Sequence, residues 1–357
     1  MLALLLLSLS ALAGVLKVHV MDVGQGDAVL IEAPGDKRVL IDAGTAGAKV
    51  ADKLLARGID SLSLAVSTHP HADHIGGMTE VLKRIEVGRY MDNGMTHTTL
   101  TYSRTMGVLE QKGIGYITAV EGRTLQLGDE VKMRIIHPRS SPLRGTRSDL
   151  NSNSVVIRLD HKDNCFLFTG DAEAPTERDM LNRGLEPCEV LKVAHHGSGH
   201  SSKSAFLRAV KPKYAAISAG EGNRYGHPDK EALGRLQSAE VKVFRTDLSG
   251  TITFTSDGKT LSVTTEKEGG DPFAGAVVHT QAGETGGTGP RININTADAE
   301  TLDQLPGVGP SRAAAILAHR KQNGPFKSCE SLIDIYGIGP KTVANIRPLC
   351  TIEEAKE

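Results

Sequence analysis

The sequence predicts an α/β protein in which a large layered domain is followed by a small all-α domain. Three observations support this prediction. Short apolar runs typical of strands alternate with stretches of helical periodicity from about residue 17 to residue 265. A segment rich in Gly, Thr and Glu then interrupts the pattern over residues 266–290. A short glycine-containing motif finally occurs twice, and each copy leads into a predicted helix.

The elements of the large domain are predicted from apolar runs bounded by turn residues. Strands are expected at 17–22, 28–32, 38–42, 62–67, 130–136, 155–159, 165–169, 190–194 and 214–218, and helices at 48–57, 176–182 and 229–237. A hairpin of strands 251–254 and 261–264 closes the domain. Because strands and helices alternate in this order, we expect helices to cover the faces of a sheet.

Length and charge limit the classes of protein that the chain can belong to. The chain has 357 residues, enough for two domains, and a formal net charge of -1. This charge excludes binding to nucleic acid through bulk positive charge, so any such binding must come from local geometry. Trp is absent and aromatic residues make up 4%, so platforms for stacking single-stranded bases are not evident.

Residues 1–14 form an apolar run that ends in small residues, which is typical of a secretory signal peptide. We therefore expect an exported protein, periplasmic or extracellular. The run contains no Lys or Arg, so a retained anchor or a buried first strand remains an alternative. No later run reaches the roughly 20 apolar residues that a membrane helix requires, and no membrane-spanning domain is expected.

Two of the four cysteines fall in each predicted domain: Cys165 and Cys188 in the first, Cys329 and Cys350 in the second. An even number suits an oxidising compartment. Cys165 begins one apolar run and Cys188 precedes another, so neighbouring strands could bring them together. The sequence does not choose between disulfides and isolated buried thiols.

Residues 68–77 directly follow an apolar strand and contain His69, His71, Asp73 and His74. Imidazole nitrogen and carboxylate oxygen are ligands that suit zinc, and also manganese or iron. A strand ending in this cluster can present His69 and His71 to one ion, while Asp73 and His74 point to a neighbouring position. The cluster therefore predicts a metal site.

The His-x-His-x-Asp-His signature resembles the metallo-β-lactamase superfamily. Further motifs at residues 18–28, 169–171 and 191–198 make the resemblance specific to the hydrolase domain of competence proteins of the ComEC/Rec2 type. The resemblance extends from about residue 16 to about residue 265. It implies that residues 15–265 form an αββα sandwich, and that the site holds two divalent cations, zinc or manganese.

The same resemblance assigns roles to residues distant from the cluster. Asp171 follows an apolar strand, and in the superfamily the aspartate at this place bridges the two ions. Asp42 matches the first superfamily motif, whose aspartate orients the metal-binding loop by hydrogen bonds. His227 matches the position at which related nucleases supply their last ligand, and we favour it. His196 is the alternative for the same role.

Four residues are candidates for catalytic roles. If His227 is a ligand, then Lys192, His195 and His196 would contact the phosphate or protonate the leaving oxygen. Asp73 would orient the attacking water in addition to binding metal. The expected chemistry is in-line attack of water on phosphorus between two cations, without a side-chain nucleophile.

Other positions are weaker candidates for the site. The third histidine that many superfamily members place on the first ion has no clear counterpart, although His137 lies in the right interval. The family shows an Asn and a Ser instead, matched here by Asn153 and Ser154. Gln25 and Asp27 lie in a glycine-bracketed loop and are expected to line the cleft, unless the glycines only form a tight hairpin.

The second domain is predicted to bind DNA. Residues 305–310 are echoed by residues 336–340, which identifies tandem helix-hairpin-helix motifs, and the first helix is expected to be capped by Asn295. Residues 291–350 resemble the DNA-binding domain of ComEA-type competence receptors. The hairpins would offer backbone N–H groups to phosphates without reading bases. The expected DNA-binding residues are Gly307, Val308, Gly309, Gly337, Ile338, Gly339 and Lys341.

The leading hypothesis is an exported metal-dependent DNase that serves DNA uptake or DNA scavenging, and a DNA-uptake channel is the expected partner protein. Residues 266–290 would act as a flexible linker that keeps the DNA-binding module near the hydrolase. One alternative is hydrolysis of another ester, such as a phosphocholine or lactam substrate, because a fold does not fix the chemistry. The other is a DNA receptor that lacks catalytic activity.

Overall fold

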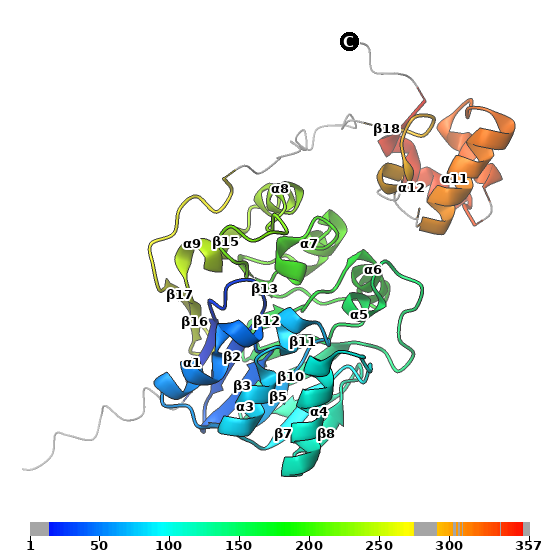
Figure 1. The fold of residues 1–357 in the computed structure, drawn as a ribbon. Coiled ribbons are helices and arrows are strands. Elements are labelled where there is room, and N and C mark those ends of the chain that lie inside the picture. The colour runs from blue at the N-terminus through cyan, green and yellow to red at the C-terminus, as the bar shows by residue number, and fades with distance from the viewer. Residues whose placement is uncertain are drawn as a thin grey trace, which may run out of the picture. The chain divides into compact units, whose positions relative to one another are not determined.

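The computed structural model describes residues 14–274, 291–302, 305, 308, 310–335 and 337–352. Residues 1–13 of the predicted signal peptide and residues 275–290 of the predicted linker lie outside the described residues. The chain divides into two compact units, residues 1–279 and 280–357 (Figure 1). Within the part of the chain that the structure describes, no helix has the length and apolar character needed to cross a membrane.

The first unit contains two stacked β-sheets. The eight-stranded sheet has the order β17 (Leu261–Thr265), β16 (Ile252–Ser256), β1 (Leu16–Val20), β2 (Val29–Ala33), β3 (Lys37–Ile41), β5 (Leu64–Val66), β7 (Arg89–Asp92) and β8 (Gly115–Thr118). The seven-stranded sheet has the order β15 (Lys242–Arg245), β14 (Tyr214–Ile217), β13 (Val190–Lys192), β12 (Asn164–Phe168), β11 (Val156–His161), β10 (Val131–His137) and β9 (Thr124–Gln126). A minor sheet pairs β4 (Ser61–Leu62) with β6 (Glu86–Val87).

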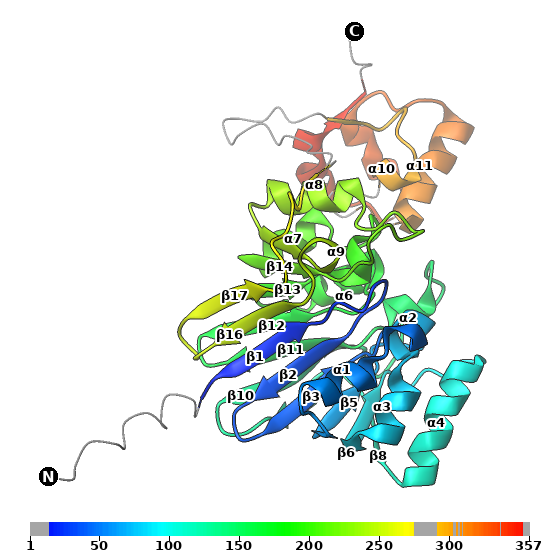
Figure 2. The same ribbon diagram turned by 60° about the vertical axis from the view of Figure 1, so that its left-hand side comes forward.

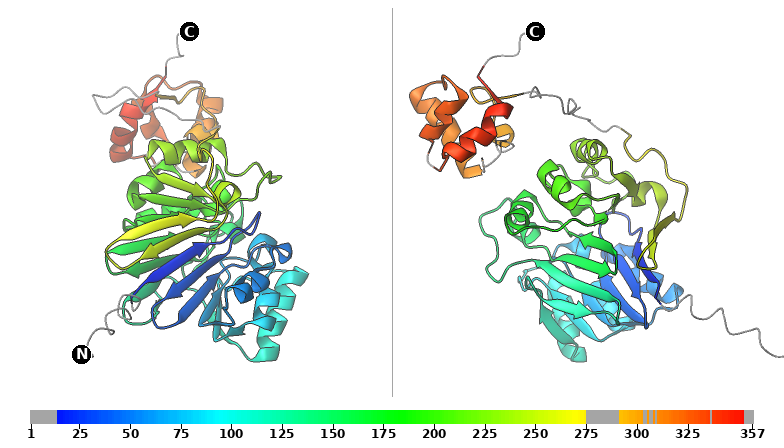
Figure 3. Two further views of the ribbon diagram at one scale, coloured as in Figure 1. Left: turned by 90° about the vertical axis from the view of Figure 1, so that its left-hand side faces the viewer. Right: turned by 180° about the vertical axis from the view of Figure 1, so that it is seen from behind.

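The space between the two sheets is the central apolar core (Figure 3). Alternate residues of each strand point inward, as the two-residue period of a strand requires. Val18 and Val20 of β1 belong to the same buried cluster as Ile157 and Leu159 of β11. Burial of these aliphatic side chains holds the sheets together.

Helices cover the outer face of each sheet, so the unit is the predicted αββα sandwich. Figure 2 shows the helices of the first half of the chain beside the first sheet. Their residues Leu54 and Val81 belong to the same buried cluster as Leu40 of β3. These helices are α1 (Val50–Ala56), α3 (Met78–Arg84) and α4 (Leu100–Lys112). The second sheet is covered by α6 (Ala174–Asn182), α7 (Ser204–Val210) and α8 (Lys230–Ser238).

Several parallel strand pairs place their carboxyl ends at one edge of each sheet. β3 runs parallel to β5, and β12 runs parallel to β13. The loops that follow these strands meet there, which is where ligands bind in α/β proteins. Short helices lie in these and other loops: η1 (Ala46–Ala48), α2 (Ala72–Ile75), α5 (Asp149–Ser152), η2 (Ala194–Gly197) and α9 (Thr246–Ser249).

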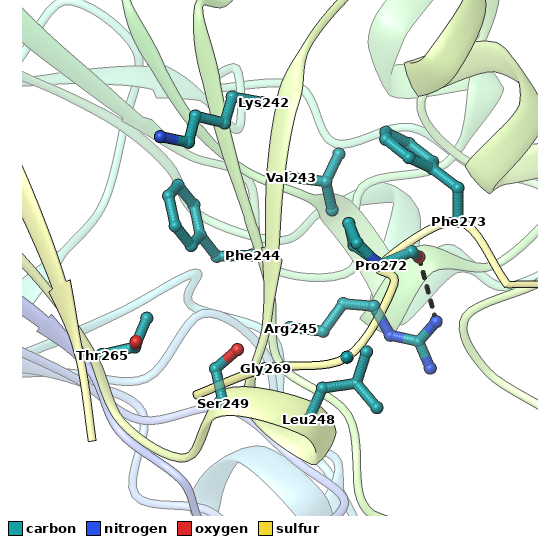
Figure 4. A pocket seen from close by; sticks show the side chains of 11 residues that line it. Lys242, Val243, Phe244, Arg245, Leu248, Ser249, Thr265, Gly269, Pro272 and Phe273 are labelled. Carbon is teal, nitrogen blue, oxygen red and sulfur yellow. Dashed lines mark hydrogen bonds between the residues drawn. The ribbon is translucent and has the colours of Figure 1, made fainter. Parts of the chain in front are cut away.

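The segment that follows β17 is docked on the first unit instead of leaving it directly. The Lys267 N–H donates to the Ser249 carbonyl at 2.9 Å, and Arg245 donates to the Pro272 carbonyl at 3.1 Å (Figure 4). Phe273 is partly buried and packs against the apolar cluster on the outer face of the second sheet. A shallow hollow of about 310 Å³ remains between this segment and β15. Residues 266–274 of the predicted linker are therefore held against the domain.

The second unit is a small helical domain with its own core. Its elements are β18 (Ile292–Asn293), α10 (Ala299–Leu302), α11 (Pro310–Asn323), η3 (Cys329–Asp334), α12 (Pro340–Ile346), η4 (Arg347–Leu349) and β19 (Cys350–Thr351). The prediction that Asn295 caps the first helix is wrong. Its side chain bonds to the backbone of Phe326, and Asp298 accepts from the Thr301 N–H at the start of α10.

Each unit contains one disulfide. Cys165 of β12 is bonded to Cys188, which lies just before β13, with a Cα–Cα distance of 5.4 Å. Cys329 is bonded to Cys350 in the second unit. Of the two possibilities that the sequence left open for the cysteines, the structure has the disulfides.

Candidate metal centre

The loop after β5 presents the first group of candidate ligands. His69 and His74 are buried, and His71 and Asp73 are partly buried. The His69 Nε2 lies 2.9 Å from the His71 Nδ1. Gly77 lets this loop pack tightly, because a Cβ at this position would lie 2.3 Å from the Ala43 carbonyl oxygen. The loop is thereby fixed against the segment that follows β3.

Asp171, which follows β12, lies at the centre of the histidines. Its carboxylate oxygens are 3.2 Å from the His74 Nε2 and 3.7 Å from the Nε2 atoms of His69, His195 and His196. Its side chain is 3% exposed, so these contacts lie almost out of solvent. The residue that the resemblance identifies as the bridging ligand therefore faces imidazoles from two separate loops.

The second pair of histidines follows β13 in an unusual backbone conformation. His195 and His196 have φ angles of 51° and 54°, in the left-handed region that side chains other than glycine rarely adopt. Two such residues in succession indicate local strain, which is typical of functional sites. The turn directs both Nε2 atoms toward Asp171.

Asp42 supports the first loop from behind. It accepts hydrogen bonds from the Thr68 N–H and the Thr68 hydroxyl, both at 2.7 Å, and from the His74 Nδ1 at 2.8 Å. Because Nδ1 is the donor, the Nε2 of His74 is free to face Asp171. This is the orienting role that the superfamily motif implies.

His196 is held in an equivalent way by a second aspartate. Its Nδ1 lies 3.1 Å from the Ser218 carbonyl, to which it donates, and 3.3 Å from the carboxylate of Asp27. Lys192 is buried and donates to Asp27 at 2.8 Å and to the Val193 carbonyl at 3.0 Å. This geometry favours a supporting role for Lys192 over the phosphate contact that the sequence suggested.

The pKa values of the carboxylates and imidazoles in the cluster depend strongly on one another. Burial alone would raise the pKa of Asp171, but His74, His196 and His195 hold it well below its usual range. Burial alone would lower the pKa of His196, but the carboxylates of Asp171 and Asp27 raise it to about 10. The carboxylates and the imidazoles of the cluster therefore stabilise the charged forms of one another.

The donor set fits a divalent metal. The His74 Nε2, the His196 Nε2 and the Asp171 Oδ1 are buried and make no hydrogen bond of regular geometry, although the two nitrogens lie 3.2 and 3.7 Å from that oxygen. This arrangement is costly unless another group satisfies these atoms. Among the described residues, ligand atoms within 4.8 Å of one another include the groups His69–His74–Asp171 and Asp73–His74–His196. Nitrogen and carboxylate oxygen in this mixture suit zinc or manganese.

His227 lies further out than His196. Its ring is 5.7 Å from the ring of His195 and nearly parallel to that of Tyr225. None of the ligand groups found within 4.8 Å among the described residues includes it. Burial lowers the pKa of His227 to about 4, so it is neutral at physiological pH and remains available as a ligand.

The weaker candidates lie around the cluster. Ser154 accepts from the Asp171 N–H at 3.1 Å, and Asn153 uses its amide group to bind the backbone of Leu143. Gln25 accepts from the Gly220 N–H at 3.3 Å. His137 donates to the Ser152 carbonyl at 2.9 Å, which makes it part of the core.

Sequence reasoning missed one group, Glu173. This buried carboxylate lies 3.4 Å from the His195 Nδ1 and accepts from Arg147 at 2.8 Å. It can orient His195 as Asp42 orients His74. The signal in the sequence was that Glu173 lies two residues after Asp171. Its contact with Arg147 gave no signal, because Arg147 belongs to a distant loop.

The predicted DNA-binding residues are partly described. Val308 and Ile338 are buried in the core of the second unit, so only their backbone can face a ligand. Gly337 has a φ of 85° and Gly339 precedes α12. Gly307, Gly309 and the side chain of Lys341 lie outside the described residues.

Comparison with known proteins agrees with this division of the chain. Residues 21–221 match the metallo-beta-lactamase superfamily, and residues 288–351 match the helix-hairpin-helix motif. The chain is 31% identical to ComE operon protein 3 of Bacillus subtilis over 67% of its own length and 33% of the relative's. It is 31% identical to competence protein ComA of Neisseria gonorrhoeae over 66% and 32%. It thus spans about a third of the length of these two relatives.

A further relative matches a different share of the chain. ComE operon protein 1 of Bacillus subtilis is 44% identical over 191 residues, which are 53% of this chain and 88% of that protein.

Proposed function

The chain belongs to the metallo-β-lactamase superfamily, and from this premise we propose that it is an exported, metal-dependent phosphodiesterase that cleaves DNA held by its helix-hairpin-helix module. The observation that carries the proposal is the convergence of buried atoms of His74, His196 and Asp171 that make no hydrogen bond of regular geometry. The fold of the superfamily implies divalent metal binding, and we propose zinc or manganese as the ions.

The proposed ligand sets share Asp171. His69 and His71 would hold one ion, and Asp73 and His74 would hold the other. For the last ligand of the second ion we propose His196, because its Nε2 lies 3.3 Å from the Asp73 carboxylate. His227, which the sequence favoured, would then lie beside the substrate.

The residues around the ions would have separate roles in catalysis. When bound, the two ions would polarise the phosphodiester and lower the pKa of a water molecule. Asp73 would orient this water, and His195, held by Glu173, would give a proton to the leaving oxygen. The exposed Arg147 beside Glu173 would neutralise charge on the phosphate. Lys192 would act indirectly by holding the carboxylate that orients His196.

DNA is the proposed substrate because the second unit matches a helix-hairpin-helix motif. One relative is the competence protein ComA of Neisseria gonorrhoeae, so we propose DNA uptake or scavenging as the setting and a DNA-uptake channel as a partner. One disulfide in each unit supports export to an oxidising compartment.

The proposal is tested by measuring DNA cleavage and bound metal on the same protein. Wild type with zinc or manganese should cleave DNA and lose this activity with a chelator. His71→Ala should lose at least about a hundredfold in rate, because the first ion loses a ligand. His97→Ala is the matched control, because its ring lies 6.3 Å from that of His71 without a proposed role.

Three outcomes would contradict the proposal. Cleavage that persists in His71→Ala or in chelator would remove the metal mechanism. Bound metal without DNA cleavage, but with turnover of another ester, would favour a different hydrolase. DNA binding without any turnover would favour a receptor.

A further inference from the structure

The loop between β14 and α8 exposes an aromatic ring beside the metal centre. Tyr225 is 53% exposed, and of the six large hydrophobic side chains that are exposed in the described residues only it and Tyr116 are aromatic. The Tyr116 hydroxyl is bonded to the Asp92 carboxylate within its own sheet. The Tyr225 hydroxyl instead accepts from the exposed Arg224 at 2.8 Å.

A chain of rings connects Tyr225 to the candidate ligands. Its ring lies 6.1 Å from that of His227 at an interplanar angle of 16°, and His227 lies 5.7 Å from the ring of His195. The His195 Nε2 is 3.7 Å from the Asp171 carboxylate. One or two nucleotides can span such a distance, with a phosphate at the metal centre and a base at Tyr225.

The charge beside Tyr225 suits a nucleic-acid backbone. The Arg224 guanidinium is exposed, it donates to the Tyr225 hydroxyl, and its carbon lies 4.9 Å from the Tyr225 ring centroid. An exposed aromatic ring next to a cation is the combination that binds single strands without reading sequence.

We infer that Tyr225 is a stacking platform for a base next to the scissile phosphate, and that the site accepts single-stranded nucleic acid. The inference rests on the proposed function and names the form of its substrate. Bases inside a duplex are already stacked on their neighbours, and taking one out costs free energy. A single strand, a frayed end or a displaced strand offers its bases without that cost.

The experiment uses the full-length protein with its metal and a set of oligonucleotides of one sequence. The strands are a normal single strand, a strand with an abasic residue on either side of one defined bond, and a duplex. Tyr225→Ala should cleave the normal strand roughly tenfold more slowly at low substrate concentration, since a stacked base is lost. Tyr225→Phe should stay close to wild type, because it keeps the ring and loses only the hydroxyl.

The abasic strand makes the test specific for stacking. Wild type should cleave it roughly tenfold more slowly than the normal strand, and Tyr225→Ala should show no further loss on it. An equal loss on both strands would mean that the variant disturbs His227 or the metal centre, and would overturn the inference. Bound metal in Tyr225→Ala should equal that of wild type.

The outcomes separate this inference from the proposed function. If wild type cleaves no strand with any metal, the proposed function fails. If wild type cleaves DNA with metal but Tyr225→Ala does so equally well, only the stacking platform fails. A wild type that cleaves the duplex faster than the single strand would also overturn it.

Discussion

Asp42, which lies outside the proposed ligand set, should affect metal affinity by orienting His74. It accepts the Nδ1 hydrogen of His74 and two hydrogen bonds from Thr68. Asp42→Ala frees His74 to rotate or change tautomer, and the affinity for the second ion should fall about 10–100-fold. Competition with a coloured chelator measures this affinity.

The control for this variant is Asp22→Ala. Asp22 precedes the loop that contains Asp27, and among the described residues its carboxylate accepts from the Gly24 N–H at 3.1 Å. Its affinity for metal should equal that of wild type. An unchanged affinity in Asp42→Ala would mean that other contacts fix the loop.

Glu177 of α6 should make the stability of the first unit depend on pH. It is buried and accepts from the N–H groups of Ser202 and Lys203. Burial raises its pKa to about 7, although those hydrogen bonds, Arg235 and Lys203 lower it. Because the folded pKa exceeds that of the unfolded chain, the contribution of Glu177 to stability decreases as pH rises from about 4.5 to 7 and is constant above.

Glu177→Gln cannot ionise and should lack this pH dependence. Its free energy of unfolding relative to wild type should rise by up to about 3 kcal/mol between pH 4.5 and pH 8. Denaturant unfolding at several pH values measures the difference. Glu80→Gln, in an exposed pair with Lys83, is the control, and parallel curves for all three proteins would contradict the expectation.

Candidate site residues that are neighbours in the sequence could be predicted. Side-chain contacts between residues that folding brings together could not. The residues His69 to His74 are recognisable because four of six consecutive positions carry candidate ligands. The contact of Glu173 with His195, and that of Lys192 with Asp27, join separate loops. No local pattern reports such contacts, so the indirect role of Lys192 could not be predicted.

At the scale of elements, β12 and β13 position the loops that carry candidate ligands of the metal centre. They run side by side in parallel, and one leads to Asp171 while the other leads to His195 and His196. The disulfide between Cys165 and Cys188 joins the opposite ends of the pair. The ends that carry ligands are thus set by strand pairing and by a covalent bond.

Replacing both cysteines should weaken this frame. The disulfide closes a loop with a sequence separation of 23, for which loop entropy predicts a loss of about 3 kcal/mol. The double variant Cys165→Ser with Cys188→Ser should therefore unfold at lower denaturant concentration, and reductant should have no further effect on this unit.

The matched control is Cys329→Ser with Cys350→Ser, which removes the disulfide of the second unit. It should leave the unfolding of the first unit unchanged. Equal stability of the first unit with and without the Cys165–Cys188 bond would contradict the expectation.

Strand positions were predictable because apolar runs are continuous in buried strands. The predicted strand 165–169 corresponds to β12, and the predicted helix 48–57 to α1. The left-handed turn at His195 was not predictable, because non-glycine residues rarely adopt it. That turn determines which histidine approaches Asp73.

At the scale of the whole molecule, the covalent link between the units should raise the local concentration of DNA at the centre. A protease site placed at residues 281–286 allows this link to be cut after folding. Cutting should lower DNA cleavage at least about tenfold at low DNA concentration, with little change at saturation. Initial rates before and after proteolysis measure this effect.

Small phosphodiester substrates provide the control, because they do not use the second unit and their turnover should not change. DNA cleavage unaffected by cutting would show that the second unit does not deliver substrate. The division into two units was predictable from composition, but the docking of residues 266–274 was not. It depends on the bond from Arg245 to the Pro272 carbonyl and on the packing of Phe273 against the apolar cluster of the second sheet.

This docked segment limits where cuts can fall. Since the chain is held as far as Ala274 and the second unit begins near Arg291, residues 275–290 bridge at most about 60 Å even when fully extended. This length, added to the dimensions of the two units, limits how far the metal centre can reach from DNA that the second unit holds. Cuts should therefore fall within a bounded distance of that binding position.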